Sequence, residues 1–332
     1  MQEIDIDLLK KEFEETEDKQ KKVEIGANLS RTLCNLGSTA EALEYGFKTV
    51  DLTKEIGDDI KYIAVMLTIA ETYYQMIENE KCVEYGNVAL AKAIEIDNSF
   101  QIAMSHYTLS LIEQNPKNAI EHALKTKEIC EMNGNTDMLG AACYSLGRQY
   151  HNIKKIDLSI DSYIKALNLA KHPSQKGILY MSIGEIYIEI QDFEQAYDYI
   201  TGAFRMFKKI NCVPGLLSCF NYLGFIYIEK KKYNKAKESA NSALKLSDEN
   251  NVDTCEYSSD SFNILAKVAH LEKDYEKAKE YFDFLLNIED ELPTYKSTKK
   301  VFYDNYIEYL KEIGDTAECE KYEKKLRELF EG

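Results

Sequence analysis

The sequence contains no tryptophan, and it holds only four prolines and fifteen glycines among its 332 residues. Proline and glycine mark loops and linkers, so their scarcity agrees with a chain in which no linker is visible. No apolar run approaches the ~20 residues that a membrane-spanning helix needs. The first twenty-two residues are too densely charged for a secretory signal peptide. These absences predict a cytoplasmic protein.

A basic stripe is also missing from this sequence. The formal net charge is −16, and lysine and arginine alternate with aspartate and glutamate instead of gathering in one region. Nucleic-acid binding normally needs such a stripe, and an acidic body repels anionic membrane surfaces. We therefore predict neither a nucleic-acid nor a membrane partner.

Recognisable catalytic and metal-binding patterns are absent as well. The chain has no P-loop, dinucleotide-binding glycine pattern, H-E-x-x-H or G-x-S-x-G. None of the five histidines has a second histidine three or four residues later, and the eight cysteines form no C-x-x-C pair. Scattered cysteines in helical patterns indicate small buried hydrophobic residues in a reducing compartment. We predict no catalytic residue, no metal and no cofactor, and keep an enzyme with an unrecognised site as a remote alternative.

What the sequence does contain is an internal repeat. Segments 145–150, 182–187 and 222–227 share one pattern, in which an apolar residue and a glycine are followed by two free positions and a tyrosine. Alanines follow Gly184 and Gly224 at the same offsets of twelve and nineteen residues. The small residue of the first helix recurs every 37 to 42 residues, at Ser30, Ala70, Thr108, Gly147, Gly184, Gly224, Ala266 and, less well, Ile307.

This pattern resembles the tetratricopeptide repeat family, in a form longer than the common repeat of about 34 residues. Similar long repeats occur in bacterial peptide-pheromone receptors, Pins-like polarity scaffolds and kinesin light chains. The resemblance implies an all-α, right-handed superhelical α-solenoid of about eight antiparallel helix pairs. It would form a single domain over residues 21–330, with residues 1–20 as a further helix packed on the first repeat. We expect irregular third and eighth repeats, because Asn115 and Pro116 shorten one turn and Ile307 is bulky.

In this fold the first helix of each pair lines a concave groove. Partner-binding residues are then expected about −3, +1, +4 and +5 from the small residue, positions that share one helix face. The predicted groove residues are Arg31, Asn35, Tyr74, Tyr144, Arg148, His151, Asn152, Asn221, Phe225, Asn263, Lys267 and His270. Asparagine offers both a donor and an acceptor to a peptide backbone, and arginine can bind a carboxylate through two parallel hydrogen bonds. The resemblance to the pheromone receptors implies that groove asparagines hold a peptide in this way.

We therefore predict a non-catalytic scaffold or receptor that binds a peptide or protein segment in its groove, in intracellular bacterial signalling or regulation. The alternative is an assembly scaffold, or the sensor part of a larger signalling protein, that uses its convex face or its terminal repeats. The aromatic residues Phe302, Tyr303, Tyr306, Tyr309 and Phe330 would either support such an assembly or cap the core. Both a monomer and a homodimer remain open.

Overall fold

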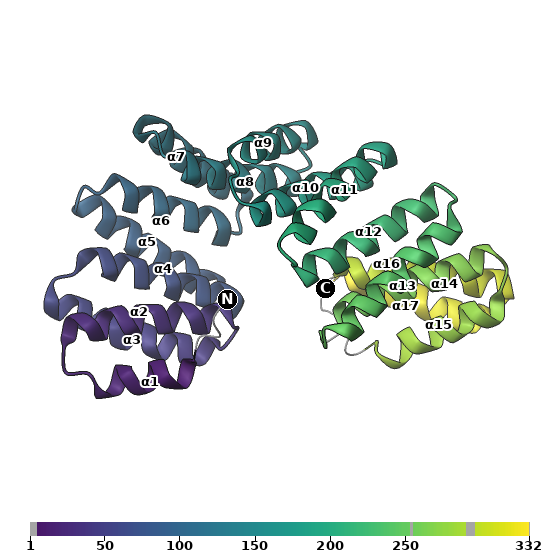
Figure 1. Ribbon diagram of the computed structural model, residues 1–332, viewed down its shortest axis with the longest axis horizontal. Helices are drawn as coiled ribbons and strands as arrows, with labels where there is room; N and C mark the ends of the chain where they lie inside the picture. Colours follow the sequence, from purple (N-terminus) through teal and green to yellow (C-terminus); the bar gives the residue numbers. More distant parts are fainter. Residues whose placement is uncertain (1–4, 253–254, 290–295, 332) are drawn as a thin grey trace. The chain divides into compact units, whose positions relative to one another are not determined.

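The computed structural model describes residues 5–252, 255–289 and 296–331. These residues form seventeen helices and no strand, which confirms the all-α prediction. The contacts divide the chain into two compact units, unit 1 (Met1–Ala170) and unit 2 (Lys171–Gly332). The helices of each unit can be followed in Figure 1. The single domain over 21–330 stays a prediction.

Unit 1 contains the helices α1 (Ile6–Glu15), α2 (Lys19–Asn35), α3 (Thr39–Ile56), α4 (Asp59–Gln75), α5 (Asn79–Glu95), α6 (Ser99–Ile112), α7 (Pro116–Asn133), α8 (Thr136–Asn152) and α9 (Ile156–Leu169). Unit 2 contains α10 (Pro173–Glu189), α11 (Phe193–Lys209), α12 (Val213–Glu229), α13 (Tyr233–Glu249), α14 (Cys255–Leu271), α15 (Tyr275–Asn287), α16 (Lys296–Ile313) and α17 (Thr316–Glu331). From α2 onward, each even-numbered helix packs against the odd-numbered helix that follows it. We name the first helix of each pair the A helix and the second the B helix. The predicted eight pairs are present.

The small residues of the repeat sit where an A helix meets a neighbouring helix. A methyl group added at Gly184 would lie 2.6 Å from Cδ1 of Ile200, and one at Gly147 would lie 2.6 Å from the ring of Tyr163. Both distances are far below van der Waals contact, so only glycine allows these helices to approach so closely. Ser30 uses its small size differently, since its Oγ donates a hydrogen bond of 2.8 Å to the carbonyl oxygen of Ala42.

The turn from A helix to B helix is repeated with the same backbone geometry. One residue per turn has a positive φ, either a glycine such as Gly37 (77°) or a larger residue such as Ile77 (62°) and Gln191 (63°). The amide after it donates to a carbonyl five residues earlier, as from Asp192 to Tyr187 at 2.9 Å. This bond pattern satisfies a carbonyl that the helix end would leave unpaired. The turn therefore closes each pair even where no glycine is present.

The third pair departs from this geometry, as the sequence predicts. Helix α6 has only 14 residues, and Glu113 after it is extended. The Asn115 side chain accepts a hydrogen bond from the Lys117 amide and so caps α7, which begins at Pro116. Proline suits the first helical turn, where no intrahelical donor is needed. Pro173 and Pro214 likewise stand at the first residue of α10 and the second residue of α12.

The two ends of the chain are held by aromatic side chains. Helix α1 packs on α2, and Phe13 is 2% exposed with its ring edge against Tyr45. The helix covers only part of the 1–20 segment because Asp18 caps α2 and starts it at Lys19. In unit 2 one buried cluster includes Phe302, Tyr303, Tyr306, Tyr309 and the bulky Ile307. These aromatic side chains fill the core, so they are not available for an assembly surface, and the side chain of Phe330 lies outside the described residues.

Candidate functional site

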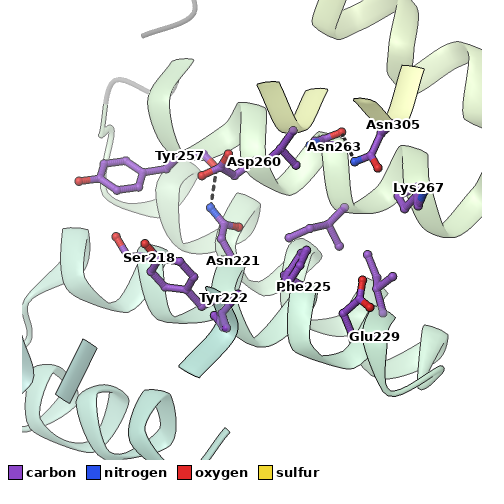
Figure 2. Close-up of a pocket in the computed structure, with 14 residues that line it drawn as sticks. Ser218, Asn221, Tyr222, Phe225, Glu229, Tyr257, Asp260, Asn263, Lys267 and Asn305 are labelled. Atoms are coloured by element: carbon purple, nitrogen blue, oxygen red, sulfur yellow. Dashed lines mark hydrogen bonds between the residues drawn. The ribbon is translucent and has the colours of Figure 1, made fainter. Parts of the chain in front are cut away.

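Unit 2 holds a pocket whose walls come from A helices alone. Its volume is about 420 Å³, within the range of ligand-binding clefts. The lining residues belong to α10, α12, α14 and α16 and are Ile188, Ser218, Asn221, Tyr222, Phe225, Ile228, Glu229, Tyr257, Asp260, Asn263, Ile264, Lys267, Val301 and Asn305. In Figure 2, Asn221 and Phe225 lie toward the middle of the pocket, Tyr257 and Ser218 toward one side and Lys267 and Glu229 toward the other. The A helices of this unit thus present one common face.

Four of the predicted groove residues meet in this pocket: Asn221, Phe225, Asn263 and Lys267. They occupy the −3 and +1 positions of the sixth and seventh repeats, so the offset rule holds in this part of the chain. It missed Ser218, Tyr222, Tyr257, Asp260 and Asn305, whereas Glu229 stands at +5 from Gly224 but was not among the predicted residues. Ser218 and Asp260 stand at −6 in their repeats, one helical step beyond −3 on the same face. Extending the rule by that step would have found them.

Asn221 lies at the pocket but is already engaged in holding two A helices together. It is 6% exposed, and its Nδ2 donates a hydrogen bond of 2.9 Å to the carbonyl oxygen of Tyr257. Its Oδ1 accepts a hydrogen bond of 2.6 Å from Oγ of Ser261. A buried amide with both ends bonded stabilises the contact between α12 and α14. Changes at this residue will therefore affect stability as well as any ligand.

The next asparagine, Asn263, forms a pair with Asn305. Nδ2 of Asn305 donates a hydrogen bond of 3.0 Å to Oδ1 of Asn263, and Asn263 is 6% exposed. Within the described residues, Nδ2 of Asn263 and Oδ1 of Asn305 have no further hydrogen-bond partner. One donor, Nδ2 of Asn263, and one acceptor, Oδ1 of Asn305, are therefore available to bond a ligand. Asn221, Asn263 and Asn305 are spaced 42 residues apart, a regularity that would have revealed Asn305 from the sequence.

The charges in the pocket are unevenly paired. Lys267 forms an ion pair with Glu308 and keeps only 15% of its side chain exposed. Glu229 is exposed at the end of α12 and makes no ion pair within the described residues. Toward the other end of the pocket, the Tyr222 hydroxyl donates a hydrogen bond of 2.6 Å to Glu185. Burial is the main cause that raises the pKa of Tyr222, and the negative charge of Glu185 and its hydrogen bond with the hydroxyl raise it further.

His270, another predicted groove residue, lies outside the pocket lining. Its side chain is 4% exposed, and its ring stands edge-on to Tyr309 at 5.9 Å between centroids. Its Nε2 is 3.0 Å from a carboxylate oxygen of Glu312 on the next A helix. His270 thus contributes to the packing of α14 against α16. The prediction that it faces the groove was wrong.

In unit 1 the predicted residues make separate local contacts. Arg31 forms an ion pair with Glu71 of the next A helix, and burial raises the pKa of Glu71 although Arg31 opposes the shift. The ring of Tyr144 is tilted against that of Tyr163 at 5.7 Å. Tyr74, with 42% exposed, is open to solvent. The remaining members are also on A helices: Asn35 and Asn152 are exposed and His151 is half-buried.

Arg148 has a structural task that the sequence did not reveal. Its Nη2 donates a hydrogen bond of 2.7 Å to the carbonyl oxygen of Leu111, and Nε2 of the adjacent Gln149 donates one of 2.9 Å to that of Ser110. These carbonyls belong to the last turn of the short helix α6. A helix end carries partial negative charge and unpaired carbonyls, so a guanidinium there is stabilising. Arg148 therefore caps the irregular third repeat.

In residues 5–252, 255–289 and 296–331, no group of three or more His, Cys, Asp or Glu side chains could hold a metal ion. Within these described residues, no helix is both long and apolar enough to cross a bilayer.

Comparison with known proteins agrees with the repeat geometry. The family model described as tetratricopeptide repeat matches residues 140–173 and 218–250, which cover α8 with α9 and much of α12 with α13. These two segments are therefore matched as tetratricopeptide repeats. A search of curated proteins gave no match.

Solved structures with a similar fold include the apo form of the quorum sensor NprR from B. thuringiensis. The identity is 15%, the match covers 97% of this chain and 91% of that one, and the TM-score is 0.68. A Rap protein complexed with competence and sporulation factor is 13% identical, with 93% and 97% covered and a TM-score of 0.53. A signal transduction ATPase with a tetratricopeptide repeat sensor, from Pyrococcus horikoshii, is 19% identical with a TM-score of 0.66, and the match covers 86% of this chain but 45% of that one. At these identities the likeness establishes the fold, in which consecutive helix pairs pack as in an α-solenoid.

Proposed function

We propose that this protein is a non-catalytic receptor or scaffold that binds a peptide or protein segment against its A helices, anchored in the unit 2 pocket. It would act in the cytoplasm in signalling or regulation, without a cofactor, a metal ion, nucleic acid or a membrane. The observation that carries the proposal is the side-chain amide pair of Asn263 and Asn305 beside an apolar cleft.

This amide pair matches the hydrogen-bonding groups of a peptide backbone. Every residue of an extended segment except proline offers one N–H and one C=O. Nδ2 of Asn263 is a donor for the carbonyl, and Oδ1 of Asn305 is an acceptor for the N–H. Such contacts hold a segment in place without dictating its sequence, so specificity must come from the rest of the pocket.

The rest of the pocket offers room for side chains of the bound segment. Phe225, Ile228, Ile264 and Val301 line the pocket together with Ile188. Val301 is 41% exposed, which indicates that this part of the pocket is open to an entering segment. Burying an apolar side chain there would contribute about 1.5–3 kcal/mol.

The fold neighbours support a receptor role. One is printed as a quorum sensor, and another was solved in complex with competence and sporulation factor. The match to the ATPase favours a second candidate, in which this chain is the sensor part of a larger signalling protein, because there the repeat sensor forms only a portion of the molecule. In both cases the pocket would bind the partner.

The test is capture from an extract of the native cells on immobilised protein. Val301→Tyr fills the pocket with a ring, and because Val301 is 41% exposed the change should leave the fold intact. Leu124→Tyr, at a site 45% exposed on α7, is the matched control. We expect mass spectrometry to identify a partner with the wild type and the control and to lose it with Val301→Tyr. Equal recovery on all three proteins would reject the pocket as the binding site.

A further inference from the structure

The turns that close the first two helix pairs of unit 1 expose large apolar side chains. Leu36, the C-cap residue of α2, is 61% exposed, and Met76, the equivalent residue of α4, is 42% exposed. Ile77 follows Met76 and, at 78%, is the most exposed large apolar residue in the described part of the chain. We name these three residues the turn strip. Folding of this chain does not bury them, so their apolar surface stays in water.

Contacts between α2 and α4 place the members of the turn strip side by side. An ion pair joins Arg31 to Glu71, forty residues later. Nε2 of Gln75 donates a hydrogen bond of 3.5 Å to Sγ of Cys34, forty-one residues earlier. The same register sets the end of α2 beside the end of α4, so the turn strip forms one surface. It stops at the third pair, where α6 is short and its C-cap residue is Glu113.

The backbone at Ile77 gives an independent reason to assign a role to the turn strip. Its φ is 62°, a conformation that a β-branched side chain tolerates poorly, and the first turn has Gly37 at the equivalent place. Of the eight residues other than glycine with positive φ in the described segments, Ile77 is the β-branched one. Local strain at an exposed apolar residue is typical of a position that serves contact with another molecule.

The charges beside the turn strip indicate a basic partner. Glu41, Glu78 and Glu80 stand at the starts of α3 and α5, directly after the strip. Glu41 is bound by Lys10 and Glu78 by Lys81, whereas Glu80 is exposed and makes no ion pair within the described residues. The formal net charge of −16 extends this negative potential. Lysine or arginine in a partner would be attracted here, while a second copy of the chain would bring the same acidic surroundings.

The extent of the turn strip suits one helix of a partner. Three side chains expose a few hundred Å² at most, well below the ~800 Å² per partner that a stable dimer interface buries. Neighbouring packed helices lie about 10 Å apart, and seven residues of an α-helix span about 10.5 Å. Apolar residues at positions i, i+3, i+4 and i+7 of one helix can therefore contact both turns.

We propose that the turn strip of unit 1 docks an amphipathic α-helix of a partner protein, whose apolar face is flanked by lysine or arginine. Ile77 inserts between side chains of that face, and Leu36 and Met76 pack against the helical turns beside it. This inference goes beyond the proposed function, because the strip belongs to unit 1 and shares no residue with the pocket of unit 2.

The experiment uses the full chain and a fluorescein-labelled probe, Leu-Lys-Lys-Leu-Leu-Lys-Leu-Leu-Lys-Lys-Leu-Leu-Lys-Leu, whose leucines form one helical stripe. Two control peptides have the same residues with the leucines spread over all faces, or glutamate in place of lysine. Fluorescence anisotropy is recorded at about 150 mM KCl, where long-range attraction is largely screened. We expect both controls to bind at least about tenfold more weakly than the probe. Equal affinities, or no binding of the probe up to about 1 mM, would overturn the proposal.

Variants of the chain locate the site. Ile77→Gly should weaken probe binding about tenfold, because an apolar side chain loses its buried contact. Glycine relieves the positive-φ strain, so thermal unfolding should show a fold at least as stable as the wild type, and the loss cannot then be assigned to unfolding. Leu36→Ser should weaken binding about three- to tenfold. Met132→Ser, the matched change at a residue 72% exposed near the end of α7, should leave it unchanged. Equal weakening by both serine variants would reveal general adhesion to exposed apolar residues and would refute the turn strip as a site.

Two further arms test other occupants and other sites. Val301→Tyr, which fills the pocket of unit 2, should leave the affinity for the probe unchanged, and loss of binding would place the probe in that pocket instead of on the strip. Sedimentation equilibrium of the chain alone, over a range of protein concentrations, tests a second copy. A wild-type dimer that Ile77→Gly abolishes would assign the strip to self-association and overturn the assignment to a partner helix.

Discussion

The Nδ1 atoms of His106 and His122 lie 2.8 Å apart, so one imidazole donates a hydrogen bond to the other across the contact between α6 and α7. The acceptor ring must therefore be neutral and carry its proton on Nε2, while the donor ring carries a proton on Nδ1. Burial is the main cause that lowers the pKa of His106 to about 4, and the nearby positive charges of His122 and Lys125 lower it further. Burial also lowers the pKa of His122, although Glu113 and Glu121 oppose that shift.

The histidine pair should make the protein sensitive to acid. The unfolded chain binds protons near the ordinary histidine pKa of 6.5, whereas folded His106 does so only near 4. Between these values the unfolded state holds more protons, so the free energy of unfolding falls as the pH falls from 6.5 towards 4. For this half-buried residue we expect a loss of about 1–2 kcal/mol.

Urea unfolding followed by circular dichroism at a series of pH values measures this loss. His106→Gln should reduce the pH dependence in that window, because the glutamine does not titrate. His172→Gln, at an exposed site at the start of α10, should retain the pH dependence of the wild type. An unchanged slope in His106→Gln would show that other groups cause the acid sensitivity.

The bond between Arg148 and the Leu111 carbonyl oxygen predicts a stability role. Arg148→Ala should lower the free energy of unfolding by about 1.5–3 kcal/mol, because a hydrogen bond to a charged donor is lost at the end of α6. Arg205→Ala removes an exposed arginine of α11 and should change it by less than about 0.5 kcal/mol. Chemical denaturation of the two variants decides the point. Equal, small effects would mean that Arg148 is free to serve a ligand.

Ile77 is the strained residue in the turn between α4 and α5. It has a φ of 62° and is 78% exposed, and a β-branched side chain tolerates this conformation poorly. Ile77→Gly should raise the free energy of unfolding by about 0.5–1 kcal/mol, since glycine accepts positive φ without strain. Ile94→Gly, inside α5, should lower it by about 1 kcal/mol. Thermal unfolding distinguishes the two, and a loss at Ile77 would contradict the proposed strain.

Glu289 ties α17 to the rest of unit 2. It accepts hydrogen bonds from the hydroxyls of Tyr303 (2.5 Å) and Tyr322 (2.9 Å) and from Lys325 (2.8 Å). Burial opposes its ionisation, but these bonds outweigh burial and lower the pKa of Glu289 below its ordinary value of 4.5. Because the folded pKa is lowered, its stabilising contribution is present above pH 4.5 and is lost as the pH falls below that value.

Glu289→Gln should therefore destabilise the protein by about 1–2 kcal/mol at neutral pH and less below pH 4. Hydrogen exchange in α17 measures the change locally. Glu280→Gln, at an exposed position of α15, should leave exchange in α17 unchanged. Unaltered protection in the Glu289 variant would show that α17 is held by its apolar contacts alone.

The repeat could be predicted from the sequence because a few small residues decide how closely helices approach. The spacing of Gly147, Gly184 and Gly224 placed the A helices, and each glycine now faces a large side chain of a neighbouring helix. The left-handed turn residue was foreseeable at Gly37 but not at Ile77, because propensity disfavours isoleucine there. The turn pattern of the whole repeat overrides that local preference.

The candidate site could be predicted only where side-chain position depends on one helix face. Asn221, Phe225 and Lys267 line the pocket because their offsets from the small residue of the repeat place them on the helix face that forms the pocket wall. Arg148 and His270 obeyed the same offsets, yet neighbouring helices use them for packing. The offset rule does not say where a helix ends or which tyrosine or glutamate the next repeat places beside a residue. These features depend on the tertiary structure.

The turns at Gln191 and Lys231 have the same backbone geometry and lie one repeat apart, so one turn could take the place of the other. Their φ values are 63° and 55°, and the following amides, of Asp192 and Lys232, bond to Tyr187 and Tyr227 at 2.9 and 2.8 Å. Excision of residues 192–231 would join Gln191 to Lys232 through a turn of unchanged geometry and shorten unit 2 by one whole repeat. The same junction would accept an added repeat, so the length of the surface that the A helices offer can be edited by cassettes of forty residues.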